Sequence, residues 1–99
     1  MTTHQFELVT IVCESVLETS VVDLTRSLGA SGFTVADVRG EGSGEKRAGE
    51  VPENKIKVQI VAESTLAKKI MAEVARIYFP NYSIIIYSSA ISVIRQDKF

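Results

Sequence analysis

The sequence lacks the features that mark several common classes of protein. It has one cysteine in 99 residues, and a single thiol excludes the internal disulfide framework of small secreted domains. No apolar run approaches the roughly 18 residues of a membrane-spanning helix. The first residues, MTTHQFE, lack a positively charged stretch followed by an apolar one, which is the mark of a secretory signal. We therefore expect a cytoplasmic protein with no membrane insertion.

An excess of either charge is also missing. Eleven Lys and Arg residues oppose twelve Asp and Glu residues, and the formal net charge is −1. This balance excludes a broad phosphate-neutralising surface, so we expect no nucleic-acid partner. The hydrophobic share of 45% and the charged share of 23% are typical of a folded soluble chain. The length predicts one domain over residues 1–99.

An internal repeat is the clearest pattern that the sequence does contain. Residues 9–17 read VTIVCESVL and residues 58–66 read VQIVAESTL, which agree at six of nine positions. Self-similarity at a fixed spacing indicates that one supersecondary unit occurs twice. The β-branched runs over residues 6–13 and 55–61 are typical of strands. Each unit is therefore expected to begin with a strand.

A helix is expected to follow each strand. Ser15 and Glu18 have the spacing of a capping box, which would begin the first helix. Leucine, valine and isoleucine then recur at the helical period, at Leu17, Val21, Leu24 and Leu28 in the first unit and at Leu66, Ile70, Val74 and Ile77 in the second. Gly29 and Gly32 would end the first helix, and Pro80 the second.

A further apolar run follows each helix, over residues 33–38 and 84–94. The order is then βαββαβ, which predicts a ferredoxin-like α+β fold: a four-stranded antiparallel sheet with two helices on one face. Residues 84–87 are consecutively apolar, whereas a half-exposed strand should alternate. We expect the face without helices to be covered by another copy of the chain. The alternative is a long strand buried within one chain.

The connection between the second and third strands holds the candidate binding residues. Residues 39–54 read RGEGSGEKRAGEVPEN and contain four of the six glycines. Successive glycines allow backbone N–H groups to point the same way and form an anion-binding concavity around Gly42 and Ser43. Lys46 and Arg47 add positive charge, and Arg39, Lys55 and Lys57 flank the segment. A solvated linker explains the pattern equally well, and the phosphate-binding motif GxxxxGK[ST] is absent.

Other candidate residues give weaker indications of a binding or catalytic site. His4 has no second histidine and is expected to be solvated, so no metal site is predicted. Cys13 is expected to pack as a small apolar side chain. Glu14 and Glu63 occupy equivalent places in the two repeat units and could act as an acid–base pair. The favoured interpretation is that they are polar residues that end strands. Tyr78, Phe79 and Tyr82 could stack on a base, but are rather expected to cap the core.

These residues together resemble the PII signalling superfamily. The segments that carry the resemblance are GFTV at 32–35, GEGS at 40–43 with Arg47 after it, the helix end at 78–79, and Tyr82 followed by IIY at 85–87. The likeness is stronger to the PII-like branch linked to inorganic-carbon uptake, namely the SbtB proteins and the carboxysome-associated PII proteins (CPII). It covers nearly the whole chain.

The resemblance implies a non-catalytic homotrimer that binds adenine nucleotides, with ADP and AMP favoured, in clefts between subunits. Gly42, Ser43 and Lys46 would hold the phosphates with Arg47 as their charged partner. The backbone at Ser83 and Ile84 would contact adenine. Bicarbonate is implied as a second ligand, with Arg47 as its contact. A bicarbonate transporter or a carboxysome component is the implied partner, and residues 40–54 would form the responsive loop. No prosthetic group is implied.

The sequence also departs from the superfamily. Residues 79–83 contain no lysine where classical members carry one, so AMP and ADP are expected to compete well with ATP. ATP and cyclic AMP stay alternative ligands. No tyrosine lies in residues 39–55 for uridylylation, and no second cysteine supports a redox tail. Two alternatives remain. One is a small nucleotide-hydrolysing enzyme whose general base would be Glu14, Glu41, Glu45 or Glu63. The other is a structural trimer with no ligand.

Overall fold

The computed structural model describes residues 1–40 and 54–99. Six main elements follow one another in the predicted βαββαβ order: β1 (His4–Glu14), α1 (Glu18–Ser27), β2 (Thr34–Val38), β3 (Lys55–Ala62), α2 (Ser64–Tyr78) and β4 (Ile85–Val93). Two short 3-10 helices, η1 (Ser15–Leu17) and η2 (Gln96–Lys98), precede α1 and follow β4. The ferredoxin-like prediction is therefore confirmed.

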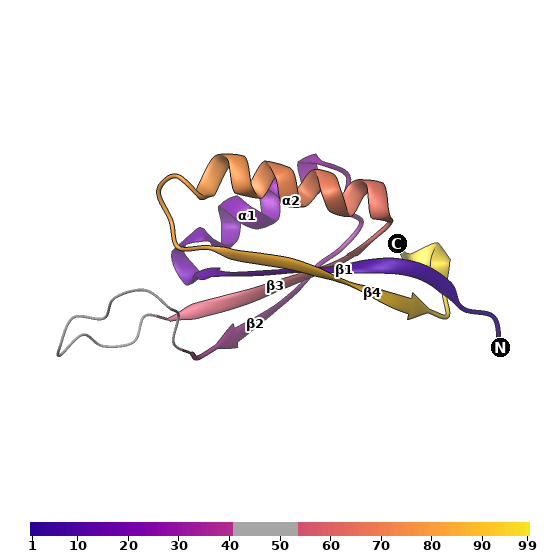
Figure 1. Ribbon diagram of the computed structural model, residues 1–99. Coiled ribbons are helices and arrows are strands. Elements are labelled where there is room, and N and C mark those ends of the chain that lie inside the picture. The colour runs from indigo at the N-terminus through magenta and orange to yellow at the C-terminus, as the bar shows by residue number, and fades with distance from the viewer. Residues whose placement is uncertain (41–53) are drawn as a thin grey trace.

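The sheet has the strand order β2-β3-β1-β4, with every neighbouring pair antiparallel. The strands of the two repeat units pair directly with each other, so that Val9 faces Ile60 and Ile11 faces Val58. Both helices lie on one face of this sheet, and the two chain ends lie at the end opposite the connection between β2 and β3 (Figure 1). The repeat therefore places one strand of each unit at the centre.

The core fills the space between the sheet and the two helices. Side chains of β3 alternate between buried and half-buried, so that Ile56, Val58 and Ile60 face the helices. The predicted helical stripes contribute fully buried side chains at Val21, Ile70 and Val74. Ile77, by contrast, stays 39% exposed. Burying one such aliphatic side chain contributes about 1.5–3 kcal/mol to the free energy of folding, so this single layer is the main source of stability.

The start of the first helix differs from the prediction. Ser15 lies inside η1, and the helix α1 begins three residues later with no side-chain cap at its N-terminus. The extended residue that a cap requires is Glu14, with φ −63° and ψ 142°. The backbone N–H of Ser15 instead donates to the carbonyl oxygen of Asn54 at 3.1 Å. The expected capping box is therefore wrong. The end of α1 is as predicted, since Gly29 has a φ of +111°, which suits glycine.

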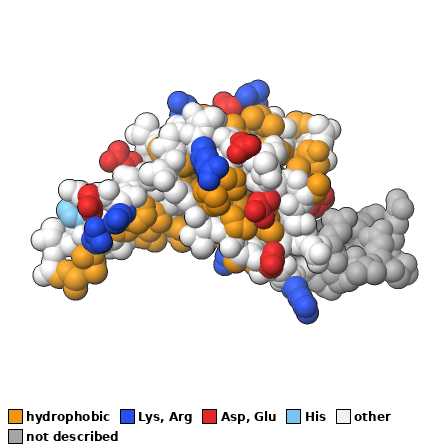
Figure 2. All heavy atoms as spheres, turned by 180° about the vertical axis from the view of Figure 1, so that it is seen from behind, with side chains coloured by type: hydrophobic (Ala, Val, Ile, Leu, Met, Phe, Trp, Pro, Cys, Tyr) orange, Lys and Arg blue, Asp and Glu red, His pale blue; other side chains and the backbone are white. Residues whose placement is uncertain are grey.

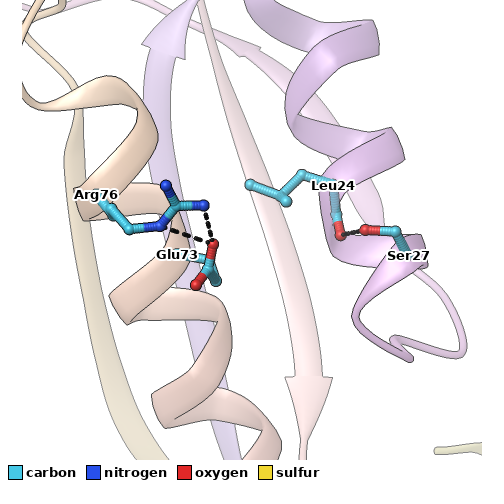
Figure 3. A network of polar contacts seen from close by, with 4 residues as sticks. All are labelled: Leu24, Ser27, Glu73 and Arg76. Atoms are coloured by element: carbon cyan, nitrogen blue, oxygen red, sulfur yellow. Dashed lines mark hydrogen bonds and ion pairs between the residues drawn. The ribbon is translucent and has the colours of Figure 1, made fainter.

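Polar contacts on the helices are mostly local. The Glu73 carboxylate of α2 accepts hydrogen bonds from Arg76 at 2.7 and 3.2 Å, and the Ser27 hydroxyl of α1 donates to the carbonyl oxygen of Leu24 at 2.7 Å (Figure 3). The Glu73–Arg76 and Ser27–Leu24 contacts are exposed to solvent, where such contacts contribute little to the free energy of unfolding. One contact joins the two helices, between the Ser20 hydroxyl and the Tyr78 hydroxyl. Tyr78 is buried and caps the core as expected, whereas Phe79 and Tyr82 are exposed.

The face of the sheet without helices is also apolar. Along the start of β4 the side chains alternate: Ile84 is 8% exposed and Ile86 packs against the core, whereas Ile85 and Tyr87 are each 50% exposed. Their partners across β1 on the same face include the half-buried Val12. The consecutive apolar residues 84–87 therefore lie alternately on the two faces of the sheet. Within the described ranges, the helices are too short or too polar to cross a membrane.

Candidate functional site

Four strand ends and their connections meet at one end of the sheet. Val38 at the end of β2 faces Lys55 at the start of β3, and Lys55 in turn faces Glu14 at the end of β1. The start of β4 lies at the same end, because Ile85 faces Val12. The connection between β2 and β3 leaves the sheet here (Figure 1). We call this region the hairpin end.

A pocket of about 350 Å³ lies at the hairpin end. Its lining residues are Ser15, Asp37, Val38, Arg39, Asn54 and Lys55. They come from β2, β3, η1 and the adjoining connection, which are distant in sequence. The pocket therefore gathers two cations, one carboxylate, one hydroxyl and one amide around a single space.

The backbone fixes where these groups lie. Asp37 and Val38 are neighbours in β2, so their side chains leave opposite sides of the strand, and Arg39 directly follows it. The hydrogen bond from Ser15 N–H to the Asn54 carbonyl oxygen holds η1 against the start of β3. The pocket thus stands on the paired backbones of three strands.

The two cations of the pocket have no carboxylate partner among the described residues. The ion pairs formed there join Glu73 to Arg76 and Arg95 to Asp97, and both are on the surface elsewhere. Arg39 is exposed and Lys55 is half-buried. A guanidinium and an ammonium that line one pocket, with no carboxylate partner in the described part of the chain, favour an anion such as phosphate or carboxylate.

The sequence-predicted site residues divide into two groups. Gly42, Ser43, Lys46 and Arg47 lie outside the described residues, so their expected roles stay predictions. Ser83 and Ile84 directly precede β4 at the hairpin end, where Ser83 is exposed and the Ile84 side chain is buried in the core.

The pocket and the start of β4 lie on opposite edges of the sheet. The strand order places β3 and β1 between β2 and β4. Neighbouring strands are about 4.8 Å apart, so the two edge strands are separated by roughly 14 Å. A ligand that contacts both Arg39 and Ser83 of one chain would have to cross the sheet. Contact with both is far easier when the two residues come from different copies of the chain.

Three pocket residues were not found from the sequence: Ser15, Asp37 and Asn54. Asp37 lies in a predicted strand, where a single carboxylate carries no signal of a site. Ser15 had been interpreted as a helix cap. Its position next to Asn54 depends on the pairing of β1 with β3, which no local pattern shows.

The suggested acid–base pair is excluded. Glu14 ends β1 at the hairpin end. Glu63 follows Ala62, which faces Glu7 near the other end of β1. Glu14 is seven residues farther along the strand than Glu7, and at about 3.4 Å per residue the two are roughly 24 Å apart. The two carboxylates therefore cannot act on one substrate within a chain, and the favoured interpretation of polar strand ends is supported. Glu41 and Glu45 lie outside the described residues.

Cys13 packs as predicted. Its side chain is 1% exposed. Burial, and to a smaller extent the Glu14 and Glu18 carboxylates, raise the pKa of the Cys13 thiol to about 11, against a weaker lowering effect of Lys55. The thiol is therefore neutral near pH 7 and poorly nucleophilic. Within the described part of the chain, no three His, Cys, Asp or Glu side chains are placed to hold a metal ion.

Charged side chains of both signs are spread over the rear face of the molecule, between patches of hydrophobic side chains (Figure 2). No extended basic surface is seen on that face, in keeping with the balanced charge of the sequence.

Comparisons with known proteins agree with the fold. The family model described as nitrogen regulatory protein P-II matches residues 6–98. A PII-like signalling protein of Thermus thermophilus is 34% identical, with a TM-score of 0.85 over 100% of this chain and 99% of that one. CPII of Thiomonas intermedia, solved with ADP, AMP and acetate, is 20% identical, with a TM-score of 0.86 over 100% of this chain and 98% of CPII.

The same CPII solved with ADP and bicarbonate is 21% identical, with a TM-score of 0.84 over 99% of this chain and 97% of that one. At this identity the likeness to CPII concerns the fold. No curated protein sequence matches the chain.

Proposed function

The chain belongs to the nitrogen regulatory protein P-II family, and on that premise we propose that it is a non-catalytic signalling protein that responds to adenine nucleotides. ADP and AMP are its preferred ligands, and bicarbonate is a second one. The output is a changed surface at residues 40–54, which act on a bicarbonate transporter or a carbon-fixation component. The response takes place in the cytoplasm.

The observation that carries this proposal is the pocket at the hairpin end, where Arg39 and Lys55 line one space without an anionic partner among the described residues. Phosphate and bicarbonate oxygens match the donors that these side chains offer. CPII, which shares the fold, is described as bound to ADP, AMP and bicarbonate. The proposed phosphate contacts at Gly42, Ser43, Lys46 and Arg47 belong to the connection that leaves from the same place.

A homotrimer is the second part of the proposal. Ile85 and Tyr87 are half exposed on the sheet face that no helix covers. Such an apolar surface favours contact with another copy of the chain. An assembly in which Ser83 and Ile84 of one subunit meet the pocket of its neighbour would let one ligand contact both, which the separation of the two edges hinders within one chain. We therefore assign the nucleotide to the cleft between subunits.

Signalling requires that the ligand prefers one arrangement of the connection over another. A ligand shifts such an equilibrium only by its difference in affinity for the two states. A difference of about 1.4 kcal/mol gives a tenfold shift. Contacts of the phosphates with Arg47 and Lys46 in only one state would supply such a difference, and bicarbonate at Arg47 would modify it.

A melting panel with AMP, ADP, ATP and cyclic AMP, each with and without bicarbonate, tests the proposal. A ligand at about 100 times its Kd stabilises the folded state by roughly 2.7 kcal/mol, so the midpoint should rise by several degrees. Arg39→Gln and Arg47→Ala should each weaken nucleotide binding by about 1.5–3 kcal/mol. Arg95→Gln, which removes a surface cation near the C-terminus, is the matched control.

Light scattering during the same titrations gives the mass of the assembly. The absence of any nucleotide-dependent shift, or a monomer at all concentrations, would contradict the proposal. Release of phosphate from ADP or ATP at about 1 s⁻¹ or faster would instead favour the nucleotide-hydrolysing alternative.

A further inference from the structure

Asp37 is the one carboxylate among the described residues that line the pocket at the hairpin end. It lies in β2, two residues before Arg39, which directly follows the strand. Asp37 makes no ion pair with Arg39, Lys55 or any other described cation. Among the described residues, no cation neutralises the Asp37 carboxylate, which lines the pocket.

We propose that Asp37 is a specificity-determining residue that limits how much negative charge the site accepts. The inference rests on the proposed function, because it takes the adenylate phosphates to lie beside Arg39 and Lys55. The feature that selects among adenylates is the Asp37 carboxylate. Together with the two cations, it gives the described lining a net charge of only +1. AMP has the least negative charge to place beside this lining, ADP has more and ATP has most.

The physical reason is like-charge repulsion at short range. Arg39 and Lys55 attract the first phosphate, and each further phosphate adds negative charge close to the Asp37 carboxylate. Asp37 is exposed, so water weakens this repulsion without removing it. At about 7 Å under such screening, two like charges change a dissociation constant roughly three- to tenfold. The penalty grows with the number of phosphates.

A different role for Asp37 predicts a different pattern. A carboxylate can also accept a hydrogen bond from a ribose hydroxyl. Every adenylate has that ribose, so loss of the carboxylate would then raise the dissociation constants of AMP, ADP and ATP by the same factor. The ratio of their dissociation constants separates the two roles, because a ribose contact leaves this ratio unchanged.

The experiment is calorimetric titration of AMP, ADP and ATP into the unmodified protein, Asp37→Asn and Asp97→Asn, in buffer with EDTA. Asn keeps the size of the side chain and removes its charge. Asp97 lies in η2, near the C-terminal end of the chain and away from the hairpin end (Figure 1). Its substitution changes the net charge equally, and at that distance salt screens its effect on the pocket. Circular dichroism checks that each variant is folded, and Asp37→Ser replaces Asp37→Asn if the latter is not.

We expect Asp37→Asn to lower the Kd of ATP by about three- to tenfold, that of ADP by less, and that of AMP least. Excess Mg²⁺, which neutralises part of the triphosphate charge, should shrink the difference. Asp97→Asn should leave the ratio unchanged. Equal changes for the three ligands, or none, overturn the role of Asp37 while the proposed function stands. If none of the three binds the unmodified protein, both fail together.

Discussion

The two faces of the sheet carry similar side chains but have different surroundings. The face toward the helices buries Val9, Ile11 and Ile60 completely. The opposite face leaves Ile85 and Tyr87 half exposed, although these residues are as apolar as those in the core. The strands that make the two faces are the same, so the difference comes from what lies on each face and not from the strands.

The apolar residues on the two faces have different roles, one in the stability of a single subunit and the other in assembly. The packed face holds a single subunit together, because its apolar area leaves water when the chain folds. The bare face keeps part of its apolar area in water after folding, so Ile85 and Tyr87 gain further stability only when another surface covers them. Substitutions on the two faces should therefore have different effects on the free energy of unfolding of a single subunit and on assembly.

The largest expected effect on unfolding comes from the packed face. Ile11→Ala should lower the free energy of unfolding by about 2–5 kcal/mol, because it removes buried methylene groups and leaves a cavity. The same change on the bare face, Ile85→Ala, is the control and should cost less than half as much. Urea denaturation at low protein concentration measures both. Equal losses would mean that the two faces do not differ within a subunit.

The pH dependence of stability tests how well the packed face excludes water. Cys13 faces the core, and its pKa is raised from 9.0 to about 11 in the folded protein. Between these two values the unfolded chain has lost the thiol proton and the folded chain retains it. Stability from this group is therefore complete below pH 9 and falls by roughly 2 to 3 kcal/mol as the pH rises to 11.

Cys13→Ala provides the reference for this measurement, because lysine and tyrosine groups titrate in the same range. The variant should lack the part of the decline that belongs to the thiol. Identical stability curves for the two proteins from pH 8 to 11 would show that the thiol ionises as easily in the folded state as in the unfolded one.

The smallest expected effect on unfolding comes from a charge on the bare face. Ile85→Asp should cost a single subunit about 1 kcal/mol or less, the range of strand preferences, but it should dissociate the assembly because a buried carboxylate without a partner is costly. Ser88→Asp is the matched control, since Ser88 is exposed on the same strand and points to the other face. Sedimentation over a range of concentrations should give monomers only for Ile85→Asp. If both variants stay assembled, the interface lies elsewhere.

Most of the fold could be predicted from the sequence because it follows from local periodicity and a repeat. The alternation in residues 55–61 and the stripes through Ile70 and Val74 each concern one element. The prediction of a capping box at Ser15 was wrong because two structures compete there. The local pattern favours a cap, whereas pairing of β1 with β3 brings Asn54 to the Ser15 amide and a 3-10 turn forms instead.

The site could be predicted only in part. Arg39 and Lys55 were identified because they flank the glycine-rich segment in the sequence itself. Asp37 and Asn54 line the same pocket, but a carboxylate in a strand and an amide in a loop carry no signal of their own. Their role depends on the register that sets Val38 against Lys55. Long-range pairing, and not composition, decides which polar groups share a space.

The pocket and Ser83 lie on opposite edges of one sheet. For the proposed nucleotide response, this placement links ligand affinity to the concentration of the protein. If the nucleotide bridges two subunits, binding and association strengthen each other by the same factor. Dilution of the protein would then weaken its response even at constant nucleotide concentration. The amount of the protein in the cell would set its sensitivity as directly as the chemistry of its ligand does.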